Sequence, residues 1–319
     1  MTDIKQQVRQ FYNQVGWQEV SEGVYQNAHY EDLRPVSREY IHRCHLRVRR
    51  HLASTGKYLL DAGSGPIQYP EYLEYSQGYR YRLCADISES GLQEARRRIG
   101  DHGLFVVCDI ANLPFKAEAF DGVVSLHTIH HLPIEEHARA YDELYRVLAP
   151  GRSAVIVNGW GYAPLAHAAD QMVKFVRRWR EHRHPEAVDC TASNPTPALP
   201  IAKNSDGEGE RRSVPLPTPH SPLAPPCSPL PTAQKGTFVK KHDAPWFQRQ
   251  IAAHIPCEIW VWRSVNVHFL RTFIHERLGG RFLLRLLYWL EERFPHFLGR
   301  NGQYPLIVLC KEAFVQRSP

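Results

Sequence analysis

The stretch Leu59-Leu60-Asp61-Ala62-Gly63-Ser64-Gly65-Pro66 decides the fold. An apolar run ends there in an acid and two closely spaced glycines. This order predicts a strand, a tight turn and then a helix, because glycine lets the backbone approach a ligand with no side chain in the way. The stretch is therefore the first candidate for a ligand-binding turn.

Apolar segments of strand length alternate with longer segments of helical pattern downstream of this turn. Strands are expected near 81–86, 104–109, 120–126, 153–157, 257–263 and 304–310, and helices over 88–99 and 135–148. Strand, helix and strand at this spacing indicate right-handed crossovers and a parallel sheet covered on both faces. The expected fold class is therefore α/β.

The chain is predicted to divide into four segments. Residues 1–56 contain two amphipathic helices that cap the ligand site, 57–181 form the ligand-binding core, and 242–319 complete the sheet. Residues 182–241 are predicted to be a disordered insertion, since half of the 24 prolines fall between 185 and 231. Such a composition buries too little apolar surface to offset its ordering entropy. Its Pro-x-Pro repeats leave open a docking site for a partner.

Composition and charge exclude several classes of protein. No apolar run reaches the roughly 20 residues that span a bilayer, and the N-terminus lacks the order of a secretory signal, so a cytoplasmic protein is expected. The seven cysteines are scattered and never form a C-x-x-C pair, which predicts reduced thiols and no metal site. The formal net charge of +6 permits an acidic partner without requiring one.

Three predicted strand ends carry acids toward one crevice, at Asp61, Asp86 and Asp109. An acid about 20 residues beyond a glycine turn can accept hydrogen bonds from ribose hydroxyls, and we assign this role to Asp86. Asp109 can meet an adenine amino group. A dinucleotide is disfavoured, because a pyrophosphate site needs G-x-G-x-x-G and the carboxylate before the first glycine repels phosphate. The pattern indicates a nucleoside that carries a cation.

The opening stretch resembles the first motif of class I S-adenosylmethionine-dependent methyltransferases. The family's later motifs are matched in order by Asp86-Ile87-Ser88, 108–115, 120–124 and 144–152, so that the resemblance covers about residues 55–160. It implies a Rossmann-like, seven-stranded, mostly parallel sheet with helices on both faces and an antiparallel last strand. S-adenosylmethionine is the implied cofactor. The chain departs from the family in two places, with Ile67 at the usual third glycine and the insertion at a usually short connection.

The resemblance implies a set of donor-binding residues at the strand ends and turns. They are Asp61, Gly63, Gly65, Asp86, Ile87, Asp109, Ile110 and His127.

The histidines after the fourth strand of the resemblance are candidates for chemistry. Methyl transfer from a sulfonium is an in-line displacement, so a base is needed only if the acceptor must lose a proton. His130 or His131 can serve as that catalytic base, with a pKa near neutrality. Structural histidines that are bonded to nearby backbone remain the alternative. A metal site is disfavoured because no companion ligand has a recognisable spacing.

A small molecule is the favoured acceptor. The candidate pocket residues are Tyr12, Trp17, Tyr25, Trp160 and Trp246, although each can also be an ordinary core aromatic. Nucleic acid is disfavoured, since no Asn/Asp-Pro-Pro-aromatic motif follows the fourth strand. The basic helix at 38–50 keeps tRNA or rRNA as an alternative acceptor.

A helical region at 268–294 raises the alternative of a lipophilic acceptor such as a quinone or lipid. Its predicted apolar face consists of Phe282, Leu283, Leu286, Leu287 and Leu290, and Arg277, Arg281 and Arg285 form a basic edge. Such a helix either rests on an anionic membrane or packs on the sheet. A last alternative is a scaffold that binds the donor without transferring its methyl group.

Overall fold

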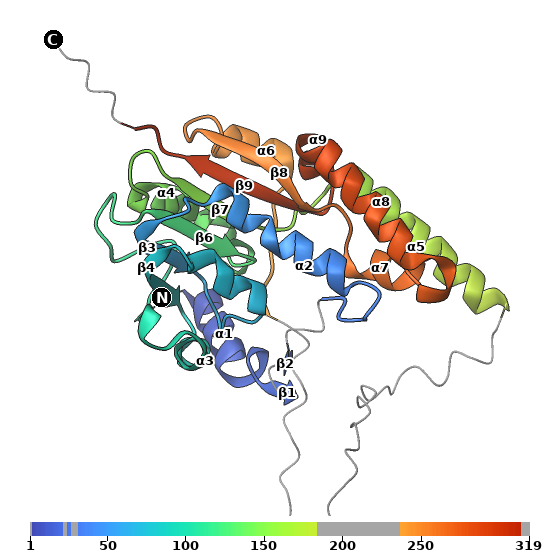
Figure 1. Ribbon diagram of the computed structural model, residues 1–319, viewed down its shortest axis with the longest axis horizontal. Coiled ribbons are helices and arrows are strands. Elements are labelled where there is room, and N and C mark those ends of the chain that lie inside the picture. The colour runs from blue at the N-terminus through green and yellow to red at the C-terminus, as the bar shows by residue number, and fades with distance from the viewer. Residues whose placement is uncertain (1, 22–23, 27–30, 184–236, 314–319) are drawn as a thin grey trace, which may run out of the picture. The chain divides into compact units, whose positions relative to one another are not determined.

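Figure 1 shows the computed structural model of the chain, which describes residues 2–21, 24–26, 31–183 and 237–313. Most of the predicted disordered insertion lies outside these residues. The chain divides into two units, of which the first contains residues 1–177 and 236–319 and the second contains 178–235. Among the described residues, no helix is both long enough and apolar enough to cross a bilayer.

The first unit contains a mixed sheet, which in the described residues has seven strands in the order β5-β4-β3-β6-β7-β9-β8. The strands are β3 (Gly56–Ala62), β4 (Tyr79–Asp86), β5 (Gly103–Val107), β6 (Gly122–Leu126), β7 (Ser153–Val157), β8 (Cys257–Arg263) and β9 (Tyr304–Cys310). Strands β3 to β7 are parallel, and β9 runs antiparallel to both β7 and β8. The expected mostly parallel sheet with an antiparallel last strand is confirmed.

The central strands are apolar along their length because both faces of the sheet are covered. Leu60, Val123 and Ala154 pack in one cluster with side chains of α4 (His137–Val147) and α6 (Ala244–Gln250). Leu59 and Val124 belong to a second cluster, which includes side chains of α3 (Glu89–Ile99). Alternate residues of a strand point to opposite faces, so the two clusters are the two sides of the sheet.

The helices end where local signals predict. Ser88 is the N-cap of α3, where its hydroxyl accepts a hydrogen bond from Gly91 N at 3.1 Å and satisfies a free amide of the first turn. The predicted helical region 268–294 consists of α7 (Val267–Phe273), a 3-10 turn at Glu276–Leu278 and α8 (Gly280–Arg293). The break falls at Gly279, whose φ of 72° suits glycine.

The remaining elements are the two short N-terminal helices and elements that the sequence did not predict. The N-terminal helix α1 (Asp3–Phe11) passes into a π-helical turn at Tyr12–Gly16, and α2 (Arg38–Leu46) passes into a 3-10 turn at Val48–His51. The sequence did not predict the hairpin of β1 (Glu19–Ser21) and β2 (Val24–Tyr25), nor α5 (Pro164–Arg183) and α9 (Pro295–Asn301). Figure 1 shows α1 at the same end of the first unit as α3.

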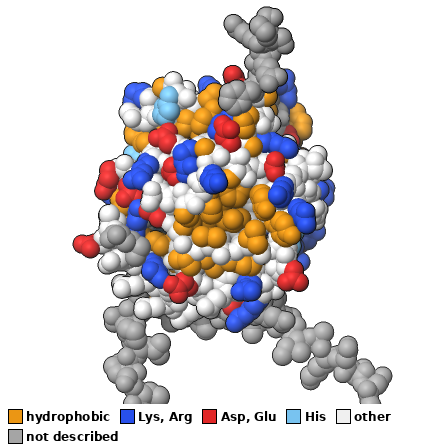
Figure 2. All heavy atoms as spheres, turned by 90° about the vertical axis from the view of Figure 1, so that its left-hand side faces the viewer, with side chains coloured by type: hydrophobic (Ala, Val, Ile, Leu, Met, Phe, Trp, Pro, Cys, Tyr) orange, Lys and Arg blue, Asp and Glu red, His pale blue; other side chains and the backbone are white. Residues whose placement is uncertain are grey.

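The surface seen in Figure 2 carries charged side chains of both signs around a central hydrophobic area. This face has no uniformly basic field of the kind that attracts a nucleic-acid backbone.

Candidate functional site

The turn after β3 has the backbone conformation that its glycines predict. Gly63 and Gly65 have φ values of 78° and 50°, a region that side chains disfavour. Gly63 N donates to Ala85 O at 2.7 Å, and the hydroxyl of Thr128 donates to Gly63 O at 3.2 Å. A Cβ at Gly63 would lie 2.1 Å from Thr128 Cγ2. The turn is therefore fixed between β4 and the loop after β6.

Ile67 stands where the family pattern has its third glycine, and its backbone keeps the glycine-like conformation. Its φ is 56° and its side chain is fully buried. A β-branched residue in this region is strained. The departure from the family pattern therefore conserves the path of the turn at a cost in backbone energy.

Asp86 at the end of β4 organises the turn through both carboxylate oxygens. Oδ2 accepts from Gly65 N at 2.8 Å, and Oδ1 accepts from Ser88 N at 2.7 Å. Burial raises the pKa of Asp86 to about 6, although these backbone hydrogen bonds oppose the rise. The carboxylate is ionised at neutral pH and lies at the carboxyl ends of the parallel strands, where ligands bind.

Asp61 has a partner that the sequence did not reveal. Its carboxylate is buried and forms an ion pair with Arg82, a fully buried side chain of β4. Arg82 also donates to the carbonyl of Tyr72. A ligand with an ammonium group that contacted Asp61 would therefore share the carboxylate with Arg82.

Asp109 lies beyond the end of β5 and meets the N-terminal helix. Its Oδ1 accepts from Ala111 N at 3.0 Å, and the ammonium group of Lys5 in α1 pairs with Oδ2 and with Glu136. Ile110 is buried in the core. Ile87, after Asp86, is partly buried.

Trp17 brings the N-terminal segment onto the glycine turn. Cβ atoms built on Gly65 and Gly91 would lie 2.7 Å and 3.0 Å from atoms of its indole ring. The ring stacks on Tyr12, with centroids 4.8 Å apart, and meets Tyr25 edge-on at 6.3 Å. The buried indole Nε1 has no hydrogen-bond partner among the described residues. Three of the predicted pocket aromatics therefore gather beside the turn.

The histidines after β6 gather at and beside a 3-10 turn at Ile129–His131. The ring centroids of His127 and His130 are 6.5 Å apart, and those of His130 and His131 are 4.2 Å apart. His127 has a φ of 55°, and its ring packs against Trp262 and Tyr304. Burial, Arg263 and Lys241 lower the pKa of His127 to about 3.

The hydrogen bonds of His131 fix its tautomer. The carbonyl of Phe238 can only accept, so Nδ1–H of His131 donates to it across 2.8 Å. Nε2 then carries the lone pair and accepts from the hydroxyl of Tyr12 at 2.9 Å. Both ring nitrogens are engaged, and burial lowers the pKa of His131 to about 4.

His130 differs from His131 because only one of its ring nitrogens has a hydrogen bond to a described residue. Its Nδ1 is hydrogen-bonded to the side-chain oxygen of Asn158, so Nδ1 carries the proton. No hydrogen bond to Nε2 is found in the part of the chain that the structure describes. Burial and the neighbouring His131 lower the pKa of His130 well below its usual value. The expectation of a near-neutral pKa is therefore wrong for both His130 and His131.

Lys241 places a cation beside these uncharged histidines. Its ammonium lies 6.0 Å from the centroid of the Tyr304 ring, and a Cβ on Gly159 would lie 2.8 Å from Nζ. No ion pair to Lys241 is found within 2–21, 24–26, 31–183 and 237–313, and burial alone lowers its pKa. Arg263, the other buried cation here, is neutralised by Glu31.

The other two predicted pocket aromatics lie elsewhere. Trp160 is buried in the core, where its indole nitrogen donates to Gly299 O of α9 at 2.8 Å. Trp246 stacks on His242 with ring centroids 3.5 Å apart. The structure does not bring either ring to Trp17. Sequence reasoning missed Lys5, Arg82, Lys241, Trp262, Arg263 and Tyr304, whose positions depend on contacts between distant segments.

Comparison with known proteins agrees with this geometry. Residues 60–156 match the family described as "Methyltransferase domain", and this range runs from β3 to β7. The chain contains a class I S-adenosylmethionine-dependent methyltransferase domain. The matched range includes the glycine turn, Asp86, Asp109 and the histidine segment of this methyltransferase domain.

Curated relatives are named for different acceptors. The human "Probable tRNA methyltransferase 9B" is 28% identical over 203 residues, which are 62% of this chain and 39% of that protein. A Xenopus tropicalis protein, "tRNA (carboxymethyluridine(34)-5-O)-methyltransferase alkbh8", is 30% identical over 142 residues, which are 38% of this chain and 21% of that protein. A Mycobacterium ulcerans "Phthiotriol/phenolphthiotriol dimycocerosates methyltransferase 1" is 32% identical over 116 residues, which are 36% of this chain and 42% of that protein. The chain thus spans less than half of each relative.

The residues of the methyltransferase domain fit S-adenosylmethionine, the methyl donor of this class. The glycine turn is packed against Thr128 and Trp17, Asp86 beside it supplies an ionised acceptor, and the buried indole nitrogen of Trp17 lacks a partner among the described residues. A polar ligand at the turn would satisfy that nitrogen, which is costly to bury alone.

Proposed function

We propose that the protein transfers the methyl group of S-adenosylmethionine to an anionic oxygen of a small-molecule acceptor. The observation that carries the acceptor class is Lys241, a partly buried ammonium without an acidic partner among the described residues. A buried cation without a counter-charge is costly. An acceptor that carries a carboxylate or phenolate would supply the missing charge.

An anionic acceptor agrees with the state of the histidines. S-adenosylmethionine supplies an electrophilic methyl group, and the electron pair of the broken carbon–sulfur bond stays on sulfur. An oxygen that is already ionised forms the new bond without losing a proton, so no base of near-neutral pKa is needed. Lys241 orients the ionised oxygen, while the uncharged histidines remove no proton from it.

His131 has a positioning role in this proposal. Its Nε2 accepts from Tyr12, and its Nδ1–H donates to Phe238 O. It holds the N-terminal segment and the chain near 238 against the loop after β6. Water is thereby kept from the reacting groups, which favours displacement by the aligned acceptor.

tRNA is the second candidate acceptor, because the names of two relatives specify tRNA and one of these names also specifies carboxymethyluridine and an oxygen. In the basic helix at 38–50, which left RNA open as an acceptor, three of the five arginines have acidic partners within 3.1 Å. Arg47 pairs with Glu291, Arg49 with Glu74 and Arg50 with Glu292. Fewer cations are thus available for a phosphate backbone, which such binding requires.

The test measures S-adenosylhomocysteine released by the full chain with aromatic carboxylates, phenols, a quinol and tRNA as acceptors. Lys241→Met is expected to lower kcat/KM for the best carboxylate or phenolate at least about tenfold, the scale of a lost buried charge pair. Donor affinity is expected to be unchanged. Lys116→Met, at an exposed lysine, is the control.

Three results would overturn the acceptor class. They are equal turnover in the Lys241→Met and Lys116→Met variants, methylation of neutral amines only, and methylation of tRNA only. Donor binding without turnover on any acceptor would instead support the scaffold alternative.

A further inference from the structure

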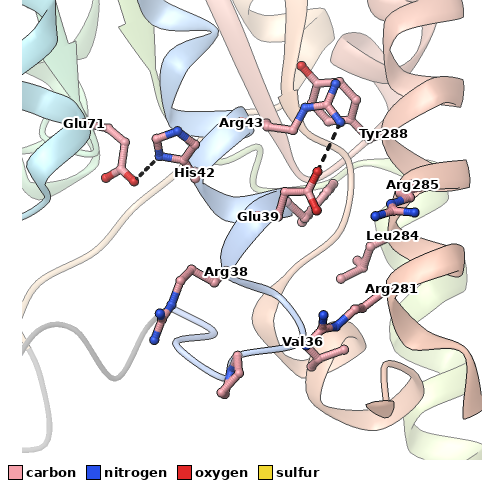
Figure 3. A pocket seen from close by; sticks show the side chains of 12 residues that line it. Val36, Arg38, Glu39, His42, Arg43, Glu71, Arg281, Leu284, Arg285 and Tyr288 are labelled. Atoms are coloured by element: carbon pink, nitrogen blue, oxygen red, sulfur yellow. Dashed lines mark hydrogen bonds and ion pairs between the residues drawn. The ribbon is translucent and has the colours of Figure 1, made fainter. Parts of the chain in front are cut away.

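A cavity of about 400 Å³ lies between α2 and α8. Its lining residues come from three places in the chain, namely 35–43, Glu71 and 281–288. None of these residues belongs to the predicted donor or acceptor site. Figure 3 shows Arg281 and Arg285 extending from α8 toward α2, with Leu284 between them.

Arginine dominates the charge of this cavity. Four arginines line it, at positions 38, 43, 281 and 285, against two acids, Glu39 and Glu71. Glu71 is engaged by His42 at 2.6 Å, and Glu39 lies 3.8 Å from Arg43. Arg38 and Arg285 have no ion pair with any described residue. Arg281 has an exposed ion pair with Glu276 at 2.6 Å, so the uncompensated positive charge is that of Arg38 and Arg285, and it suits an anion.

The outer side of α8 is apolar and exposed. Leu284, Leu287 and Tyr288 of α8 pack inward, and Glu291 near its end is fully buried. Phe282, Leu286 and Trp289 are exposed by 69%, 44% and 58% of their surface. They recur at helical spacing and form one stripe beside the arginines. The sequence did not decide whether the apolar face of this helix packs on the sheet or rests on a membrane. Most of that face is exposed and does not pack on the sheet.

We propose that α8 docks on an anionic membrane surface and that the cavity takes a lipid phosphate headgroup. Arg281 and Arg285 would meet the phosphate, while Phe282, Leu286 and Trp289 would enter the boundary between headgroups and acyl chains. A helix with large apolar residues on one side and arginines beside them is the usual form of an interfacial helix. Each arginine near an anionic surface strengthens binding about fivefold.

The apolar stripe favours a membrane over RNA as the occupant. RNA phosphates could pair with the arginines, and a base could stack on Trp289. RNA would offer no apolar partner for the aliphatic side chain of Leu286. Exposed large apolar side chains that gather in one place mark interaction sites. The proposal does not depend on which acceptor is methylated.

The test is co-sedimentation of the full chain with vesicles. Binding is expected to vesicles of phosphatidylcholine mixed with an equal part of phosphatidylglycerol, to weaken as salt rises, and to be absent with phosphatidylcholine alone. Arg281→Gln with Arg285→Gln is expected to reduce binding about tenfold or more. Phe282→Ser with Trp289→Ser is expected to reduce it similarly, since both side chains are exposed and their loss leaves the core intact.

The matched control is Arg96→Gln with Arg97→Gln, which removes two exposed charges from α3. It is expected to bind vesicles as the natural chain does, and all variants are compared by thermal unfolding. The proposal is overturned by an absence of vesicle binding at low salt, by equal loss in the control and α8 arginine variants, or by arginine-dependent binding of tRNA without vesicle binding. It is also overturned if inorganic phosphate at low ionic strength occupies the cavity while vesicles do not bind.

Discussion

The hydroxyl of Tyr12 lies 2.9 Å from Nε2 of His131, and the second nitrogen of that ring lies 2.8 Å from Phe238 O. One imidazole thus joins the N-terminal segment, the loop after β6 and the chain that returns after residue 236. The cover over the candidate site depends on contacts between segments more than a hundred residues apart, since Tyr12 and His131 are separated by 119 positions.

Tyr12→Phe is expected to weaken binding of S-adenosylmethionine up to about tenfold, because the net contribution of one hydrogen bond is about 0.5–1.5 kcal/mol. Loss of the hydroxyl leaves Nε2 of His131 without this donor and loosens the N-terminal cover. Isothermal titration measures the change. Tyr162→Phe, at an exposed tyrosine, is the control, and equal affinities of the two variants would contradict the role of the cover.

Donor affinity is expected to fall as the pH drops through about 6, because burial raises the pKa of Asp86 to about 6. In the ribose-binding role predicted for Asp86, the ionised carboxylate would accept hydrogen bonds from ribose hydroxyls, and protonation would remove one acceptor. The loss is at most about tenfold per pH unit for one titrating group. His127 and His131 do not add to it, since their pKa values are lowered to about 3 and about 4.

The measurement for this pH prediction is the dissociation constant of S-adenosylmethionine between about pH 8 and about pH 5, across the titration of Asp86. Asp86→Asn is expected to bind weakly at every pH and to lack the dependence. A natural chain whose affinity is as flat as that of Asp86→Asn would exclude Asp86 as the titrating group.

Arg82→Met is expected to destabilise the fold by about 3–5 kcal/mol, because it leaves the carboxylate of Asp61 buried and unpaired. Asp61→Asn with Arg82→Met removes both charges and is expected to cost less than Arg82→Met alone. Urea unfolding gives both free energies. If the free energy of unfolding of Arg82→Met lay within about 1 kcal/mol of that of the natural chain, water or another group would be able to replace Arg82.

Ile67→Gly is expected to be more stable than Ile67→Ala by about 1 kcal/mol, which reverses the usual order of these residues. Both variants lose the buried side chain, but only glycine relieves the positive φ of 56°. Thermal or urea unfolding of the two variants decides it. Greater stability of Ile67→Ala would mean that this backbone carries no such strain.

The sheet and the donor side of the site follow closely from the sequence. Strand-length apolar runs, most of them followed by an acid or a turn, predict where β3 to β7 lie along the chain, because this pattern depends on local composition and on burial of both faces. The sequence predicts that the acid at the end of the next strand lies beside the glycine turn. Asp86 does so and accepts a hydrogen bond from Gly65 N. The positions of Gly63 and Gly65 in left-handed backbone follow from the same local rule.

Side-chain pairing between distant segments could not be predicted in the same way. Arg82 has the pattern of an ordinary strand arginine, and only the pairing of β3 with β4 brings it to Asp61. Lys241 falls at the end of the segment that was predicted to be disordered. Two backbone hydrogen bonds hold that end in place, from Lys240 N to His130 O at 2.9 Å and from Gly161 N to His242 O at 2.8 Å.

The most direct test of the account is isothermal titration of the full chain with S-adenosylmethionine. We expect one donor bound per chain with a dissociation constant in the micromolar range, little change in Asp101→Asn at an exposed acid, and a large loss in Asp86→Asn. Absence of binding to the natural chain at millimolar donor, or unchanged affinity in Asp86→Asn, would contradict it.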